Sequence, residues 1–525
     1  MSGDVCLVLH AHLPFVRHPE HKYHLEENWL FEATVATYLP MLEVLRGLLR
    51  DQVPHRLTMS MSPPLCSMLR DDLLKTRTAA YLDRLVVLGE RELERTAGDP
   101  AFAPLAHFYH DRFRRLRGLY DSIGGDVVRA YSELQEQGSL EIITVGGTHG
   151  FQPVLREATS RRAQLEVACD SYARCFGRPP RGIWLPECGY AEGVDQLVAD
   201  AGLRYFFVDA HGVGFARPRP PLGLHAPIYT HSGAAAFARD TESGKQVWSS
   251  KEGYPGDAAY RDFYRDLGFD LPLDVIGPFV HPDGIRVHTG YKYFRVTGGD
   301  VDLAHKQPYD PGLAAQRADE HAAHFVAARG DQMDTLSHQL PRRPVVVSPY
   351  DAELYGHWWF EGPTFLDRVM RRAAEQQRFR LATCPEVLDH DPVQAVADPC
   401  PSSWGDGGFA GVWIDGSNDW IYRHVHRAET RMHDLVRKHP HPTDLERRAL
   451  NQAGRELLLL QSSDWAFIMK TATAVRYACD RVKAHLSRFR RLDRELVAGQ
   501  VDAEWLADLE SRDNLFPELD HRLWS

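Results

Sequence analysis

The 525-residue sequence lacks several features that define large classes of protein. Its eight cysteines include no CxxC pair, so neither a zinc ribbon nor a disulfide framework is predicted, and a reducing compartment fits this usage. No stretch approaches the ~20 consecutive apolar residues of a membrane span. The apolar run at 5–9 is also too short for a secretion signal. We therefore expect a cytoplasmic protein without a membrane partner.

Positive charge is in the minority as well. The chain has 61 Lys and Arg against 72 Asp and Glu, a net charge of -11, which would repel a phosphate backbone, so no nucleic-acid partner is expected. The motifs GxGxxG, GxxxxGK[ST] and GxSxG are absent, which removes the dinucleotide, P-loop and α/β-hydrolase interpretations. Hydrophobic residues make up 43% of the chain, as in globular proteins. The expected ligand is neutral or small.

Short β-rich runs recur along the chain, and each ends in polar residues. Helical patterns such as 161–176 and 193–201 lie between several of them. This alternation predicts an α/β fold with a parallel sheet, and a barrel is favoured. In such folds the loops after the strands hold the active site. The β-rich runs are 5–9, 140–145, 182–185, 205–208 and 344–347, and the polar residues to examine are His10, His12, His149, Glu187, Asp209 and Asp351.

The domain organisation follows from changes in pattern. A catalytic barrel is expected over 1–395, with a helical insertion at about 67–135 and a long cleft loop at about 230–256. A C-terminal helical domain at 396–525 is expected to pack on the barrel and complete the cleft. Long loops in compact domains are usually functional or mobile.

His10 and His12 point to one face of the first predicted strand. Three interpretations remain open: binding of substrate hydroxyls, a metal site with His149 and Asp351, or two buried hydrogen-bonding histidines. A metal site of this kind would need further strand-end ligands, and no strand-end lysine is found.

Glu187 and Asp351 are the candidate catalytic pair. Each follows a predicted strand, and they are 164 residues apart, as groups from different strands would be. Acid and base catalysis at neutral pH needs two carboxyl groups whose pKa values are split by their surroundings. The neighbouring Cys188 is rejected as a nucleophile, because an adjacent carboxylate would raise its pKa.

Tryptophans downstream of this pair suggest a sugar substrate. Sugar rings stack on indole, and their hydroxyls need polar partners around the rim. Any one tryptophan could also be part of the core. That alternative is weaker for Trp404 and Trp413, which lie in the glycine-rich stretch 402–418. The tryptophans concerned are Trp358, Trp359, Trp404, Trp413 and Trp420.

Five ordered motifs resemble those of glycoside hydrolase family 57, and within it those of the 1,4-α-glucan branching enzymes. The branching-type resemblance rests on Arg239-Asp240, Trp248-Ser249, GYPG at 253–256 and YRD at 264–266. The five motifs are HAHLP at 10–14, GTHGFQP at 147–153, WLPE at 184–187, SPYDAE at 348–353 with GHWW at 356–359, and SSDW at 462–465.

This resemblance implies an incomplete (β/α)7 barrel that needs no metal or cofactor and acts on α-1,4-glucan. It implies a retaining mechanism with Glu187 as nucleophile and Asp351 as general acid/base, for which a carboxyl separation of roughly 5 to 5.5 Å is expected. By similarity, Arg265, Gly284, Trp404 and Asp464 would bind the glucan. The other expected substrate-binding residues are His10, His12, His149, His357, Trp358 and Trp413.

One departure from the resemblance concerns the cleft loop. Branching enzymes of this type are expected to carry a tyrosine near the loop tip, but here no tyrosine lies between Tyr229 and Tyr254. Phe237 is the expected apolar substitute. The loop and the two tryptophans of the 402–418 stretch are predicted to exclude water. Branching therefore competes with α-amylase and 4-α-glucanotransferase activity as the predicted function.

Overall fold

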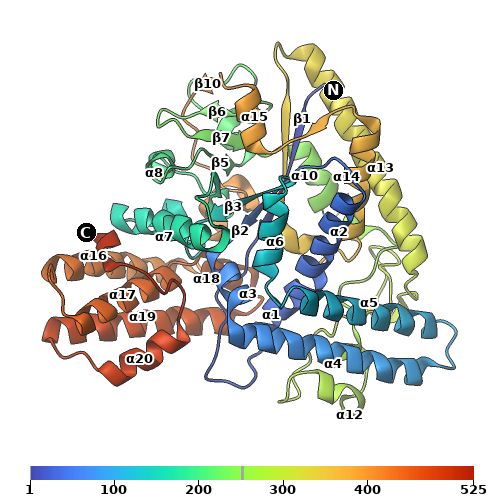
Figure 1. Cartoon of the computed structure of the whole chain (residues 1–525), viewed down its shortest axis with the longest axis horizontal. Helices are drawn as coiled ribbons and strands as arrows, with labels where there is room; N and C mark the ends of the chain where they lie inside the picture. Colours follow the sequence, from blue (N-terminus) through green and yellow to red (C-terminus); the bar gives the residue numbers. More distant parts are fainter. Residues whose placement is uncertain (1, 250–252) are drawn as a thin grey trace.

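A computed structural model describes residues 2–249 and 253–525. A curled, mostly parallel sheet forms the centre of the molecule (Figure 1). Its strands run in the order β10-β6-β7-β5-β4-β3-β2-β1-β8, with β9 beside β1. The main strands are β1 Asp4–Ala11, β2 Leu57–Met61, β3 Leu140–Val145, β4 Gly182–Trp184, β5 Tyr205–Val208, β7 Ala235–Ala238 and β8 Val345–Asp351, and the short ones are β6 Ile228–Tyr229, β9 Arg380–Leu381 and β10 Ala395–Val396.

The curled sheet closes on itself at a single point. Arg239, just after β7, forms a parallel bridge with Val347 of β8, and the Asp240 backbone N–H donates to the Val347 carbonyl at 2.8 Å. Strands β1, β2, β3, β4, β5, β7 and β8 thus surround one interior as an incomplete (β/α)7 barrel. The predicted α/β barrel is therefore confirmed, and the carboxyl ends of β1, β4 and β8 face a common site.

Helices cover the outside of the barrel and form two further bodies. None of those in the described residues is long and apolar enough to cross a membrane. The helices are α1 Glu27–Ala33, α2 Leu39–Arg50, α3 Pro63–Arg70, α4 Asp72–Thr96, α5 Ala103–Ser122, α6 Val127–Glu136, α7 Ala158–Phe176, α8 Val194–Asp200, α9 Ala210–Gly214, α10 Thr241–Trp248, α11 Leu267–Asp270, α12 Leu273–Ile276, α13 Pro311–Gln339, α14 Gly362–Gln376, α15 Cys384–His390, α16 Tyr422–Lys438, α17 Asp444–Leu460, α18 Ser463–Thr471, α19 Val475–Ala498 and α20 Ala503–Arg512.

Two helical bodies flank the barrel. Helices α3 to α6 occupy the stretch between β2 and β3 that was expected to be a helical insertion, and α4 and α5 project from the barrel as a long pair. Helices α16 to α20 gather on another side (Figure 1). This second group of helices contacts the barrel through α18, because the Ser463 backbone N–H donates to the His149 carbonyl at 3.0 Å.

The expected cleft loop at about 230–256 is largely regular structure. Residues 235–238 form strand β7, which pairs with β5 in parallel and with β6 in antiparallel, and α10 follows. Phe237 is fully buried between Tyr205 and Phe207, so it is not a cover over the cleft. The alanines alternate between the two faces of the sheet: Ala235 packs with Tyr205 and Phe237 on one face, and Ala236 and Ala238 pack on the other. Residues 250–252 of the expected loop lie outside the described residues.

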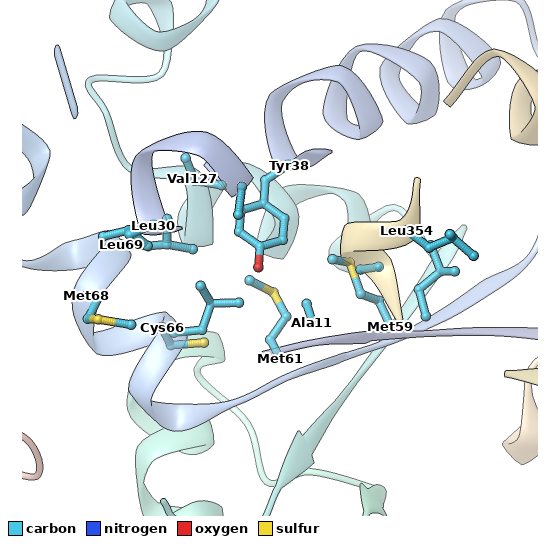
Figure 2. Close-up of a cluster of buried hydrophobic side chains, with 14 of the residues drawn as sticks. Ala11, Leu30, Tyr38, Met59, Met61, Cys66, Met68, Leu69, Val127 and Leu354 are labelled. Carbon is cyan, nitrogen blue, oxygen red and sulfur yellow. The ribbon is translucent and has the colours of Figure 1, made fainter. Parts of the chain in front are cut away.

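A π-helical turn packs against the loop that follows β8. Residues Thr34–Tyr38 form this turn between α1 and α2, and π-turns are frequent at functional sites. The Tyr38 ring projects from it toward Ala11 and Met61, at the ends of β1 and β2 (Figure 2). Gly356 lies against the same turn with a φ of 117°, and a Cβ there would come within 2.0 Å of the Ala36 carbonyl oxygen. Only glycine fits this close approach.

Candidate active site

Glu187 lies immediately after β4, in a tight turn. Its backbone has a φ of 62°, in the left-handed region where side chains other than glycine are rare, and His149 after β3 shares this feature. Such strained positions cluster at functional sites. Its two carboxylate oxygens accept hydrogen bonds from Trp404 Nε1 at 2.9 Å and from Ser463 Oγ at 3.0 Å. Both donors come from the C-terminal part of the chain.

Asp351 ends strand β8, in register with His10 of β1. Burial, and then the nearby Glu353 and Glu187, raise the pKa of Asp351 well above its ordinary value, while Arg239 lowers it. Since Glu187 is one of the causes, the two carboxyl groups face the same interior. The predicted separation of 5 to 5.5 Å remains a prediction.

The surroundings divide the two carboxyl groups into different roles. Burial raises the pKa of Glu187 to about 7, but the hydrogen bonds from Trp404 and Ser463 favour its charged form. Asp351 receives no such donor among the described residues, so the proton of a singly protonated pair resides on Asp351. This arrangement supplies one ionised and one protonated carboxyl group at neutral pH, as a nucleophile and an acid require.

Glu353 is a third buried carboxyl group, whose role the sequence analysis did not identify. It accepts hydrogen bonds from the Tyr38 hydroxyl and from the His12 backbone N–H. Burial raises its pKa to about 7, and its charge in turn raises the pKa of Asp351. Glu353 could have been identified from the sequence, because it follows Asp351 by two residues in the motif SPYDAE. Its partner Tyr38 could not be paired with it from sequence.

A chain of hydrogen bonds connects the barrel floor to Glu187. Ser463 gives its hydroxyl hydrogen to Glu187 and must therefore accept from His149 Nδ1, 2.8 Å away. The other nitrogen of His149 then accepts from His10 Nε2 at 3.0 Å, and His10 Nδ1 accepts from Ser60 at 2.7 Å. Burial lowers the pKa of both histidines well below the ordinary value, which keeps them neutral as this chain requires.

This chain bears on the interpretations of the histidines. His10 and His149 are only 3% and 2% exposed, and their hydrogen bonds position Glu187. Their direct binding of glucan stays a prediction. His12 is more exposed and lies nearer the opening, where its ring stacks on His149 at 3.8 Å.

His12 and Asp464 form an ion pair across the site. His12 Nε2 lies 3.0 Å from Asp464, and His12 Nδ1 is 2.7 Å from Ser62 Oγ. Burial alone would raise the pKa of Asp464, but His12, His149 and Ser462 outweigh it and lower the pKa to about 2. Ligand atoms of His12, His149 and Asp464 lie within 4.8 Å of one another and could hold a metal ion. The set does not include Asp351, which the metal interpretation required.

The two tryptophans of the glycine-rich stretch have different environments. Trp404 packs edge-on against Trp184 at 4.9 Å and donates to Glu187, so it forms part of the catalytic wall. Trp413 is 1% exposed, packs against Phe151 at 4.6 Å and is therefore core. Gly405 of the glycine-rich coil lies against its ring, and binding of glucan by Trp413 stays a prediction.

Four further predicted residues lie away from this centre. Trp358 is 44% exposed and its ring is 6.2 Å from that of the half-buried His357. Arg265 binds Asp270 at 2.9 Å and stacks on Phe294, and Gly284 is an exposed turn residue. Among residues 2–249 and 253–525, no hydrogen bond or ring contact joins Arg265 or Gly284 to Glu187 or Asp351.

Curated relatives cover nearly the whole chain. The 1,4-alpha-glucan branching enzyme of Thermococcus kodakarensis is 32% identical over 98% of this chain and 78% of that protein. A probable 1,4-alpha-glucan branching enzyme of Mycobacterium tuberculosis is also 32% identical, over 99% of this chain and 98% of that protein.

Solved structures share the whole fold. The alpha-amylase AmyC of Thermotoga maritima is 42% identical with a TM-score of 0.94, covering 100% of this chain and 99% of that one. A branching enzyme of the same family from Pyrococcus horikoshii is 33% identical with a TM-score of 0.90, covering 100% and 97%. These two structures therefore carry two different named activities.

Two family models match the chain, one at each end. The model of the branching-enzyme C-terminal region, described as "1,4-alpha-glucan branching enzyme, C-terminal", matches residues 424–524. The model described as "Glycosyl hydrolase family 57" matches residues 6–269, which include Glu187 and the histidines of the first two motifs. Together with relatives that are 32% identical over 98% and 99% of this chain, these observations show that the chain belongs to glycosyl hydrolase family 57.

Proposed function

We propose that this protein is a 1,4-α-glucan branching enzyme, which cleaves an α-1,4 linkage and transfers the released chain to a 6-hydroxyl of another glucan. The observation that carries the proposal is the carboxyl pair Glu187 and Asp351, whose pKa values are split by Trp404 and Ser463 from the C-terminal part of the chain. That part ends in the region matched by the branching-enzyme model. The cytoplasmic location stays a prediction from cysteine usage.

In the first step, Glu187 attacks the anomeric carbon while Asp351 donates its proton to the departing glycosidic oxygen. The C–O bond of the linkage breaks as the bond between the sugar and Glu187 forms, so the shortened glucan leaves with a free 4-hydroxyl. The neutral His149, which donates through Ser463, holds the carboxylate of Glu187 in its attacking orientation. No proton has to leave Glu187, because two donors already favour its ionised form.

In the second step, Asp351 is ionised and takes the proton of an incoming 6-hydroxyl. The oxygen of that hydroxyl attacks the anomeric carbon on the face opposite Glu187, and the bond between the sugar and Glu187 breaks, which frees the carboxylate and restores the original configuration. Trp404, His12 and Asp464 surround Glu187 and offer an aromatic face and polar groups to the glucan. Exposed Trp358 is proposed as a more distant stacking surface.

Hydrolysis is the second candidate, and one observation favours it. The solved structure at 42% identity is named an alpha-amylase. Much of the cleft loop predicted at about 230–256 is strand β7 and helix α10, so a mobile shield over the cleft does not come from residues 235–238 or 241–248. If water reaches the glycosyl-enzyme, the same two carboxyl groups give α-amylase activity, and a 4-hydroxyl acceptor gives 4-α-glucanotransferase activity.

Product analysis on amylose tests the proposal. Branching creates α-1,6 points, which isoamylase then releases as short linear chains, whereas hydrolysis creates reducing ends without new branches and 4-α-transfer lengthens linear chains. We expect isoamylase-sensitive products to exceed new reducing ends. The Glu187→Gln variant, which lacks the proposed nucleophile, is the inactive control. A predominance of reducing ends in the wild-type reaction would instead assign the chain as an α-amylase.

A further inference from the structure

A small, partly open cavity lies where the helical insertion meets the barrel loops. Its volume is about 40 Å³. Helix α5 contributes Arg112 and Phe113, the segment after α10 contributes Arg261 and Lys292, and the loop after β8 contributes His357 and Phe360. The cavity is separate from the catalytic pair, since neither Glu187 nor Asp351 lines it.

Two arginines face this cavity without a carboxylate partner. Arg261 is 9% exposed and its Nε, like Nη2 of Arg112, is buried without an acceptor among the described residues. Both guanidinium groups lie over the ring of Phe360, at 4.6 Å for Arg112 and 3.9 Å for Arg261. A buried donor without an acceptor costs about 1–3 kcal/mol, more when it is charged. In contrast, Arg115 on the same helix binds Glu43 at 2.9 Å.

The remaining charges do not neutralise these two groups. Lys292 adds a third cation and is held by the Phe263 carbonyl at 2.5 Å and by Asp266 at 3.4 Å. Asp266 is saturated by the backbone N–H groups of Thr289 and Gly290 and by the Thr289 hydroxyl. Burial raises the pKa of Glu32, the other acid on the cavity wall, to about 8, so it is neutral at pH 7.

Glu361 lies behind this wall and is also occupied. One of its oxygens accepts from the Tyr309 hydroxyl at 2.7 Å and from the Arg261 backbone N–H at 3.1 Å, and neither of these bonds reaches the guanidinium groups. Asp266 balances the charge of Lys292, and the second oxygen of Glu361 is buried without a hydrogen bond. The cavity therefore offers two guanidinium groups, each with an N–H donor that has no acceptor among the described residues.

We propose that this cavity binds a small inorganic anion between Arg112 and Arg261. The volume suits chloride or orthophosphate with a water molecule, since a water needs roughly 10–15 Å³ by the same measure, and it is too small for a glucosyl unit. Guanidinium groups with free N–H donors are the preferred protein ligands of such anions. The anion would link the helical insertion to the loop that carries His357 and the exposed Trp358.

Thermal unfolding tests the proposal. Melting temperatures of the full chain are compared in sodium chloride, in sodium phosphate and in the sodium salt of HEPES, all at equal ionic strength and pH 7. A bound anion raises the Tm by about 2 °C at 100 times its Kd. The two salts distinguish chloride from phosphate as the natural ligand. Crystals soaked in bromide should show an anomalous peak between Arg112 and Arg261.

Variants separate this site from a general salt effect. Arg112→Gln and Arg261→Gln should each abolish the anion-dependent shift without lowering the Tm in HEPES, because each removes a repelled cation. The matched control Arg115→Gln should keep the full shift. If neither anion raises the Tm, if the shift persists in both variants, or if bromide is absent from the cavity, the proposal is wrong. A shift produced only by maltose and lost in Arg112→Gln would also overturn it, in favour of a sugar site.

Discussion

At the scale of single residues, the ionisation state of Glu187 depends on groups that are distant in sequence. Ser463 and Trp404 hold its two oxygens, and the neutral His149 fixes the orientation of Ser463. The ionisation of the nucleophile is therefore set by the C-terminal part of the chain.

Replacing either member of the carboxyl pair tests their assignment. Glu187→Gln or Asp351→Asn should lower kcat on the order of 10³-fold or more with little change in glucan binding, because each group acts mainly in the transition state. Initial rates on amylose and calorimetric binding of maltooligosaccharides measure the two effects. Glu192→Gln, an exposed change in the loop after Glu187, is the matched control and should behave as wild type.

The pH profile of kcat/KM should report the same pair. Burial raises the pKa of Glu187 to about 7, and its charged form exists only above that value, so activity should fall as the pH drops below about 7. Activity should fall again at high pH, once Asp351 loses its proton. Trp404→Phe removes a hydrogen bond to the carboxylate and should move the acid limb to higher pH.

The control for that shift is Trp420→Phe, a half-buried tryptophan whose ring contacts His424 away from Glu187. An acid limb that stays in place in Trp404→Phe would show that another group controls it.

Chelation tests the cluster of His12, His149 and Asp464. Both ring nitrogens of each histidine already have protein partners, so we expect full activity after exhaustive dialysis against EDTA. Loss of activity that zinc restores, accompanied by stoichiometric metal in the wild type and none in His12→Ala, would assign a metal to the cluster.

At the scale of elements, the turn after β8 depends on its contact with the π-helical turn before α2. Gly356 has a left-handed φ, and a side chain there would collide with the Ala36 carbonyl oxygen. Glu353, just before it, receives its hydrogen bond from Tyr38 of the same turn. These elements must pack closely for Asp351 to keep its position.

Gly356→Ala should therefore destabilise the protein by about 1–3 kcal/mol or more, from backbone strain and steric overlap. Urea unfolding followed by tryptophan fluorescence measures this loss. Gly118→Ala provides a control of opposite sign, because Gly118 is exposed within α5 with open space around it, and alanine should stabilise the helix by about 0.5–1 kcal/mol. Equal stability of Gly356→Ala and wild type would mean that the turn relaxes freely.

At the scale of the whole molecule, one ion pair joins the beginning of the chain to its end. His12 follows β1 and Asp464 begins α18, and their side chains meet at 3.0 Å within the site. Because burial would otherwise raise the pKa of Asp464, its lowered value of about 2 measures the pull of His12 and the neighbouring donors. The barrel and the C-terminal helices are thus coupled through the site itself.

This coupling predicts a pH dependence of stability. The pKa of Asp464 is lower in the folded state than its unfolded value of 3.8, so its ionised form stabilises the folded state at pH values above 3.8. This contribution is lost as the pH falls toward 2. At pH 7 the contribution is roughly 2 kcal/mol. Asp464→Asn should lower the Tm at pH 7, and its difference from wild type should shrink between pH 4 and pH 2. Asp480→Asn, an exposed change on α19, should show no such trend.

The sequence by itself determined the barrel and the position of the catalytic pair. Buried runs that end in polar residues fix parallel strands, and the carboxyl ends of parallel strands meet at one end of a barrel. Glu187 and Asp351 therefore had to lie together, whatever the details of their surroundings. The helical character of 67–135 was equally readable, because amphipathic periodicity is local.

Only the tertiary structure decided which side chains are buried and which partners they have. Alanines at 235 and 236 have weak strand propensity, yet they form β7 because the strand pairs with β5 on one side and β6 on the other. Trp413 is core because a coil distant from the barrel strands folds over it. The pKa values of Glu187 and Asp351 depend on donors and charges that lie far away in the chain, and such non-local contacts have no local pattern in sequence.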